Sequence, residues 1–184
     1  MKNLRILIPS LALAALTATG CFLISGQIVV SANLGDLHAV NGLSAVGMYV
    51  DLSAESSDYK DHKDKLKDIV DIAVLGTFRN NLGAPVSGEV WIVPSPSSAA
   101  LLANQAAVVT AGGIKLWAMS LGANETRKVD WDASASLFTA AGKTMLKDQI
   151  KGDGVFTLYL FGSTTTYDIQ VDNAVVVAVI SANP

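Results

Sequence analysis

The amino-acid sequence predicts a mainly β protein, an antiparallel β-sandwich with one charged helix and one or two short helices. Short segments rich in β-branched and aromatic residues recur along the chain, and Gly, Asn, Asp or Pro separates them about every ten residues. Hydrophobic residues make up 51% of the 184 residues, which is enough for one core. We expect the largest apolar side chains to be buried in that core: Phe78, Trp117, Trp131, Phe156 and Leu158.

Alternation of apolar and polar residues defines the expected strands. Segments 71–78 and 87–94 are separated by turn residues, as are 114–121 and 125–131, so each pair is expected to form a hairpin. The last strand should bulge or turn at Asp172 and Asn173. Five of its apolar residues should share one face: Ile169, Val171, Val175, Val177 and Val179. The full set of strands is expected at residues 25–32, 46–52, 71–78, 87–94, 114–121, 125–131, 155–162 and 167–180.

Three segments have helical character. In the charged segment 55–69, apolar or aromatic side chains recur at spacings of three and four residues, which places Tyr59, His62, Leu66 and Ile69 on one helical face. Residues 97–105 have helical composition over a short length. Residues 134–150 are expected to form a helix that Gly142 weakens. Its face toward the sheet should consist of Leu137, Ala141, Met145 and Ile150.

The first 20 residues have the features of an export signal. Lys2 and Arg5 form a basic head, an uncharged Leu- and Ala-rich run follows, and small residues lead to Cys21. The residues Ala18-Thr19-Gly20-Cys21 resemble the lipobox of bacterial lipoproteins, although Ala18 stands where Leu is most frequent. That resemblance implies cleavage before Cys21 and covalent attachment of diacylglycerol and acyl groups to this residue.

The alternative for this segment is an uncleaved membrane-spanning helix. Uncharged sequence runs from Ile6 past Ile24, about the length that a bilayer requires. Pro9 interrupts the run, and the first charge after Arg5 is Asp36, so the charged residue that usually ends a spanning helix is missing. The lipoprotein interpretation is therefore preferred.

The lipoprotein resemblance implies a signal peptide at 1–20 and a single mature domain of 164 residues at 21–184, with a helical insert at about 55–69. Phe22, rather than Asp, follows Cys21, which in Gram-negative lipoproteins indicates the outer membrane. The mature part resembles envelope lipoproteins with an immunoglobulin-like sandwich. Segments 78–81, 121–131 and 154–162 are also similar in pattern to LEA-type-2 domains, a similarity that implies no functional residue.

The charge of the mature domain argues against nucleic acid as a partner. Of the 13 basic residues two precede Cys21, and none of the 16 acidic residues does, so the mature net charge is −5. Binding to nucleic acid requires a basic surface that neutralises phosphates. The expected partners are the membrane, through the lipid anchor, and another protein of the cell envelope.

One group of oxygen-bearing side chains is a candidate calcium site. Calcium takes six to eight oxygen ligands from a flexible loop. The candidate ligands lie at alternating or helical spacing: Asp51, Ser53, Glu55, Asp58 and Asp61. The alternative is a solvated helix start, where the helix dipole favours carboxylates. No other cofactor is expected apart from the lipid groups on Cys21.

Catalytic motifs are lacking in the sequence. It contains no GxSxG, no HExxH and no pair of cysteines at zinc-binding spacing. His38, in an expected Gly-punctuated loop, is the candidate general base, and no nearby residue is marked as its nucleophile. Gly142-Lys143-Thr144 is similar to the end of a P-loop, but Leu137 replaces the first glycine of that motif.

Three functional hypotheses follow from these observations. The first is a non-enzymatic, lipid-anchored envelope protein with a structural or partner-binding role. The second is a carrier whose sandwich holds a hydrophobic ligand or lipid, because both faces of 71–78 and 155–161 are apolar. The third is a hydrolase that uses His38.

Overall fold

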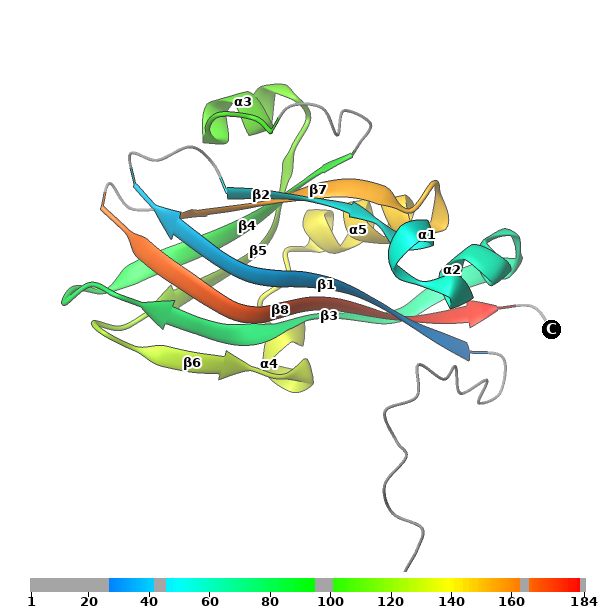
Figure 1. The fold of residues 1–184 in the computed structure, drawn as a ribbon, viewed down its shortest axis with the longest axis horizontal. Helices are drawn as coiled ribbons and strands as arrows, with labels where there is room; N and C mark the ends of the chain where they lie inside the picture. The colour runs from blue at the N-terminus through cyan, green and yellow to red at the C-terminus, as the bar shows by residue number, and fades with distance from the viewer. Residues whose placement is uncertain (1–26, 42–45, 95–100, 163–165, 183–184) are drawn as a thin grey trace, which may run out of the picture.

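Two four-stranded antiparallel sheets pack face to face (Figure 1). The computed structural model describes residues 27–41, 46–94, 101–162 and 166–182. In order across the first sheet lie β1 (Gln27–Val40), β8 (Asp168–Ala182), β3 (Leu66–Asn80) and β6 (Thr126–Val129). The second sheet contains β2 (Val46–Asp51), β7 (Val155–Gly162), β4 (Val86–Pro94) and β5 (Ile114–Leu121). The predicted mainly β, antiparallel sandwich is confirmed.

The strand pairing is that of a jelly roll. Strands of the first half of the chain pair in antiparallel fashion with strands of the second half: β1 with β8, β2 with β7, β3 with β6, and β4 with β5. The chain is therefore arranged as one long hairpin, rolled so that successive pairs lie in opposite sheets. This connectivity differs from the expected immunoglobulin-like one, whose two sheets contain strands ABED and CFG.

Both predicted hairpins are wrong for the same reason. β3 and β4 lie in different sheets, and so do β5 and β6. β6 pairs with β3, over Gly76 to Arg79, and β4 pairs with β5 and β7. The turn residues do mark chain reversals, but a reversal does not determine which strand becomes the hydrogen-bonding partner. In this fold the chain crosses to the opposite sheet at each of these reversals.

Short connections meet at one end of the sandwich, here named the short-loop end. The backbone N–H of Asn41 donates to the carbonyl of Tyr167 (3.1 Å), and that of Asn81 donates to the carbonyl of Asp168 (3.0 Å). The N–H of Asn124 donates to the carbonyl of Leu82 (2.8 Å). Because β1 ends here at Val40, its first residue, Gln27, lies at the opposite end (Figure 1).

The core lies between the two sheets. Phe78, Trp117, Phe156 and Leu158 are buried there as predicted, and the rings of Phe78 and Trp117 lie 4.8 Å apart. Trp131 is the exception because it begins helix α4 (Trp131–Ala135) instead of ending a strand. Its side chain is only half-buried, and the indole Nε1 donates to Asp71 Oδ2 at 2.8 Å.

A row of irregularities crosses the first sheet at one level. The register shifts at Gly35 in β1, at Gly76 in β3 and at Asp172 and Asn173 in β8. Gly35 and Asn173 both have positive φ angles, +67° and +54°, which Gly and Asn adopt at lower cost than other residues. The backbone N–H of Asn173 donates to Asp36 Oδ1 (2.8 Å), which fixes the bulge.

The bulge changes which face of β8 is buried. Ile169 and Val171 point into the core before it, and Ala174, Val176, Ala178 and Ile180 point into the core after it. The predicted bulge is confirmed, but the prediction that Val175, Val177 and Val179 share a face with Ile169 and Val171 is wrong. The extra residue in the bulge shifts the two-residue alternation by one, so these three valines point away from the core.

The predicted helix 55–69 is too long. Helices α1 (Leu52–Glu55) and α2 (Ser57–His62) are followed by a 3₁₀ turn, η1 (Lys63–Lys65), and then β3 begins at Leu66. Ile69 is buried, but as a strand residue opposite Ile180. Pairing with β8, which is distant in sequence, therefore overrides the local helical periodicity.

Tyr59 is the residue of this segment that holds the helices to the domain. Its side chain is completely buried, and its hydroxyl donates to the carbonyl of Ile150 at 2.7 Å. Burial, followed by the nearby charges of Asp153 and Asp51, raises the pKa of Tyr59 to about 12. The phenol therefore remains a neutral donor over the physiological pH range.

The first expected strand and the other two expected helices differ in their bounds. β1 continues eight residues past the predicted end at 32, so the connection expected from Asn33 onward is mostly strand. The helix expected at 97–105 is wrong over its described part, because residues 101–104 are not helical; α3 (Gln105–Thr110), with Asn104 as its N-cap, begins only at the last predicted residue, and residues 95–100 lie outside the described part. The helix expected at 134–150 is divided into α4 and α5 (Ala140–Lys151).

The division between α4 and α5 occurs where the chain pairs with the edge of β5. The backbone N–H of Thr139 donates to the carbonyl of Leu116 (3.0 Å), and Thr139 is also the N-cap of α5. The buried face of α5 consists of Gly142, Leu146 and Ile150. Of the face predicted from the sequence, Ile150 is correct, whereas Ala141 is exposed, and Leu137 and Met145 are half-buried.

Replacement of Gly142 by Ala should destabilise the domain, although Ala is the better helix former by about 1 kcal/mol. A Cβ at Gly142 would lie only 2.6 Å from the carbonyl oxygen of Lys115, against backbone that cannot move aside. We expect the free energy of unfolding to fall by about 2 kcal/mol or more, measured by urea denaturation. Gly83→Ala is the control because nothing lies within 4 Å of its added Cβ. Equal stability of the two variants would contradict the close packing of α5 on β5.

Candidate functional site

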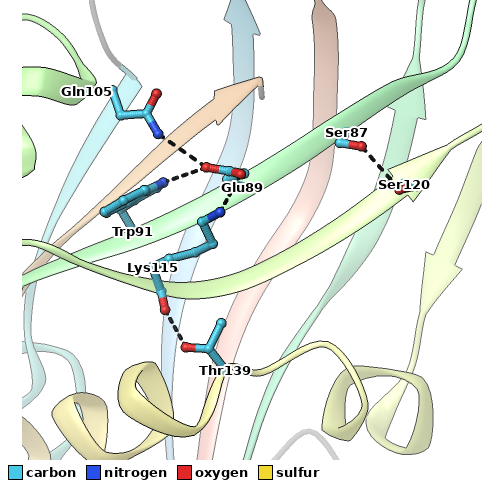
Figure 2. Close-up of polar contacts among 7 residues, drawn as sticks. All are labelled: Ser87, Glu89, Trp91, Gln105, Lys115, Ser120 and Thr139. Carbon is cyan, nitrogen blue, oxygen red and sulfur yellow. Dashed lines mark hydrogen bonds and ion pairs between the residues drawn. The ribbon is translucent and has the colours of Figure 1, made fainter. Parts of the chain in front are cut away.

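A polar cluster lies on the outer face of the second sheet (Figure 2). Its members are Glu89 and Trp91 from β4, Lys115 from β5 and Gln105 from the first turn of α3, and it is named the Glu89 cluster. Glu89 Oε1 lies 2.6 Å from Lys115 Nζ. Glu89 Oε2 accepts hydrogen bonds from Trp91 Nε1 (3.0 Å) and Gln105 Nε2 (3.2 Å).

The Glu89 carboxylate is buried, with 7% of the residue exposed, so its charge needs partners. The Lys115 ammonium supplies the opposite charge and also lies 5.7 Å from the centre of the Trp91 ring. Both carboxylate oxygens are therefore occupied by donors of the protein itself. An acid–base role for Glu89 would require that these donors be displaced.

The cluster attaches α3 to the sheet. Val108 of α3 packs on Val93, Tyr159 and Phe161, which together form a small apolar layer outside the second sheet. The Tyr159 hydroxyl accepts a hydrogen bond from the backbone N–H of Leu102 at 3.1 Å. Gln105 extends this contact to Glu89 at the start of the helix. The Glu89 cluster therefore holds β4, β5 and α3 together.

Loss of the Lys115 ammonium should therefore be costly. In Lys115→Met the Glu89 carboxylate remains buried without its cation, and we expect the free energy of unfolding to fall by about 2–3 kcal/mol in urea denaturation. In the Glu89→Gln/Lys115→Met double variant no buried charge remains, so part of that loss should be recovered. Lys128→Met, at an exposed position of β6, is the control and should change stability by less than about 0.5 kcal/mol. A Lys115→Met variant as stable as this control would show that the Glu89 cluster does not stabilise the packing of β4, β5 and α3.

The candidate calcium ligands lie in and just before the two short helices, and one of them, Asp51, has a capping role. Asp51 is the N-cap of α1, and its Oδ1 accepts hydrogen bonds from the backbone N–H of Ser53 (2.9 Å) and of Ala54 (3.3 Å). Ser53 and Glu55 lie in α1, and Asp58 and Asp61 lie in α2. Across the described ranges, no three His, Cys, Asp or Glu side chains are grouped closely enough to hold a metal ion. The structure does not bring the five residues together, and calcium binding stays a prediction from the sequence.

His38 lies in a strand and not in the expected loop. It is an exposed residue of β1, and its Nε2 lies 2.8 Å from Asp168 Oδ1 at the short-loop end. The same carboxylate oxygen accepts a hydrogen bond from Asn81 Nδ2 at 2.8 Å. The hydrogen bonds from Asn81 and His38 lower the pKa of Asp168 below its ordinary value. Because the side chains of His38 and Asp168 are 56% and 27% exposed, the contact between them adds little stability by itself.

The lowered pKa of Asp168 determines how stability should depend on pH. The contribution of this group to stability is present above its ordinary pKa of 3.8 and is lost as the pH falls through the lower folded-state pKa. In Asn81→Ala we expect the pKa of Asp168 to rise, followed by NMR titration of the carboxyl carbon. The variant should lose more stability at neutral pH, where Asp168 is ionised, than at acid pH, where this group becomes protonated. An Asp168 pKa that does not move would contradict the assignment of Asn81 as its main hydrogen-bond donor.

Two hollows bear on ligand binding. The first is an apolar void of about 20 Å³ between the sheets, lined by residues such as Phe78, Leu158 and Val171. That volume accommodates about one water molecule. The second is an open groove of about 420 Å³ beside α5, lined by Ile114, Ala140, Ala141, Thr144, Met145 and Asp148. Gly142, the first residue of the GKT sequence, lies on the buried face of α5 and packs against the backbone of β5.

Comparison with known proteins identifies no family for the chain. No protein-family model matches it, and no curated protein sequence matches it. Among solved structures, a chain of Desmodium yellow mottle tymovirus aligns with 100% of this chain and 98% of its own length, at 10% identity and a TM-score of 0.26. A TM-score this low carries no argument about fold or function. Within the described ranges, no helix has the length and apolar composition needed to cross a membrane.

Proposed function

We propose that the chain is a lipid-anchored protein of the bacterial cell envelope whose jelly-roll domain has a non-enzymatic, structural or partner-binding role. The observation that carries the proposal is the N-terminal sequence, in which a basic head and an apolar run precede Ala18-Thr19-Gly20-Cys21. The first described strand begins at Gln27, six residues after Cys21. Phe22 at the position after Cys21 supports the outer membrane as the destination.

The small volume of the void between the sheets supports a structural or partner-binding role over that of a ligand carrier. Pockets for small ligands occupy about 300–1,000 Å³, far more than the void between the sheets. The Glu89 carboxylate, which is the buried acid on the outer face of β4, is fully paired. The carrier alternative is based on the apolar faces of 71–78 and 155–161, and the void between these strands is too small for a ligand. The groove beside α5, whose volume falls in the range of ligand pockets, is the remaining place for one. Lipid that co-purifies with the protein in a native mass spectrum would favour the carrier.

Metabolic labelling tests the anchor. Cells that express the chain should incorporate labelled palmitate into it, and the protein should fractionate with membranes. Cys21→Ser removes the thiol that would be lipidated, so the variant should take up no palmitate and should remain uncleaved or become soluble. Ser25→Cys in the Cys21→Ser background is the control, because it restores a thiol outside the lipobox. A wild-type chain without incorporated palmitate would overturn the proposal.

A further inference from the structure

The outer face of the first sheet carries an apolar patch, here named the valine face. After the bulge in β8, Val175, Val177 and Val179 alternate with the buried residues Ala174, Val176, Ala178 and Ile180, so they point outward. Val29 of β1 lies directly opposite Val179 and is 52% exposed. On the other side, Val179 pairs with Asp71, next to Val70, which is also 52% exposed.

A bulge adds Val70 to this face. The register of β3 against β8 shifts between Ile69 and Asp71, which leaves Val70 as the extra residue. Ile69 points into the core, so Val70, the next residue, points outward. Asp71 is an acidic residue at the rim of the patch, and the exposed Asp68 lies two residues before Val70. Its carboxylate is engaged by the Trp131 indole (2.8 Å) and lies 3.5 Å from Lys143 Nζ.

The two sheets of the sandwich differ in how their outer faces are covered. The second sheet has α3 packed on Tyr159 and Phe161 and fastened by the Glu89 cluster. On the first sheet, α1 and α2 contact β1, but they bury Leu52 and Tyr59 in the core, and Val29 of β1 remains 52% exposed. Val175, Val177 and Val179 are half-buried, whereas Val29 and Val70 beside them are each 52% exposed. A partly exposed apolar patch of this kind is typical of an interaction site.

The length of chain before β1 indicates what lies against this face. An extended residue spans about 3.3–3.6 Å, so the six residues from Cys21 to Gln27 reach about 20 Å at most. Val29 is two residues further along the chain, in the half of β1 that lies away from the short-loop end. A lipid group on Cys21 would therefore keep the valine face within a short distance of the bilayer.

We propose that the valine face is the surface with which the anchored domain rests on the lipid bilayer, an inference that depends on the proposed lipidation of Cys21. A tether this short gives the face a local concentration near the membrane in the millimolar range, so a weak apolar contact is enough to populate the docked state. The short-loop end, with His38 and Asp168, is then the part of the domain furthest from the tether along β1.

Spin labels on the acylated protein in phosphatidylethanolamine–phosphatidylglycerol vesicles test this orientation. Acylation blocks Cys21, so an introduced cysteine is the single free thiol. Labels at Val29→Cys and at Ser31→Cys, which lies opposite Val177, report on the valine face. A label at Val109→Cys is the matched control, because Val109 is also 52% exposed but belongs to α3 on the other sheet. Collision rates with oxygen and with a water-soluble nickel complex give the depth of each label.

The expected result is a several-fold loss of nickel collisions and a gain in oxygen collisions at positions 29 and 31, with no change at position 109. Equal water exposure at all three positions would overturn the proposal. Spin–spin broadening at position 29 would overturn it in favour of a second copy as the occupant. A label at Asp64→Cys in η1 that is protected while position 29 is not would overturn it in favour of end-on contact.

The same preparation separates failure of this inference from failure of the proposed function. Flotation of the protein with the vesicles and the mass of the acylated N-terminus are measured before the labels are analysed. A chain that carries no acyl group and does not float disproves the proposed anchor. A chain that is acylated and floats, but whose label at position 29 remains in water, disproves only the docking of the valine face.

Discussion

The central position of β8 is the constraint on which the rest of the domain depends. This strand, the last in the described chain, lies between β1 and β3 and pairs with both of them along its length. Because β1 and β3 both pair with β8 and not with each other, the first sheet cannot form until the C-terminal strand β8 is in place. Such pairing between distant segments makes the sheet a feature of the whole chain and not of any local segment.

The bulge at Asp172 and Asn173 gives β8 its two different faces. It matches the irregularities at Gly35 and Gly76 in the neighbouring strands, so the three strands change register together. A Cβ at Gly76 would lie 3.4 Å from the backbone carbonyl oxygen of Asp172, so the backbones of β3 and β8 approach closely at this level. Past the bulge, small and branched residues fill the core, and valines line the outer surface. The outer surface of the second sheet is instead covered by α3, with the charge of Glu89 neutralised beneath it.

Local patterns in the sequence predict most of the strands but not their partners. Alternation identifies β2, β4, β5 and β7 nearly to their ends, because each is a short segment with turn residues on both sides. The helix expected to continue to Ile69 ends early because β8, more than a hundred residues away, pairs with β3 from Leu66 onward. Alternation of apolar and polar residues does not predict that Val175 points outward, because its direction depends on the bulge, where Asn173 has a positive φ angle.

The Glu89 cluster is not among the sites predicted from the sequence, although the sequence contains a signal for it. Glu89 stands in the middle of an otherwise apolar strand and two residues before Trp91, so both side chains must share a face. The partner of Glu89, Lys115, lies on a strand 26 residues away, and only the pairing of β4 with β5 brings the two together. By contrast, the lipobox-like sequence at Cys21 is a short linear motif, and such a motif can be recognised without knowledge of the fold.

The phase of β8 can be measured directly by the reactivity of single cysteines at positions 174 to 179 in a Cys21→Ser background. The structure predicts that cysteines at 175, 177 and 179 react rapidly with a water-soluble maleimide, whereas those at 174, 176 and 178 are protected in the folded protein. Unfolding in urea should make all six react equally. The reverse pattern, with 175, 177 and 179 protected, is what uninterrupted alternation from Ile169 would produce. That result would contradict both the bulge and the existence of the valine face.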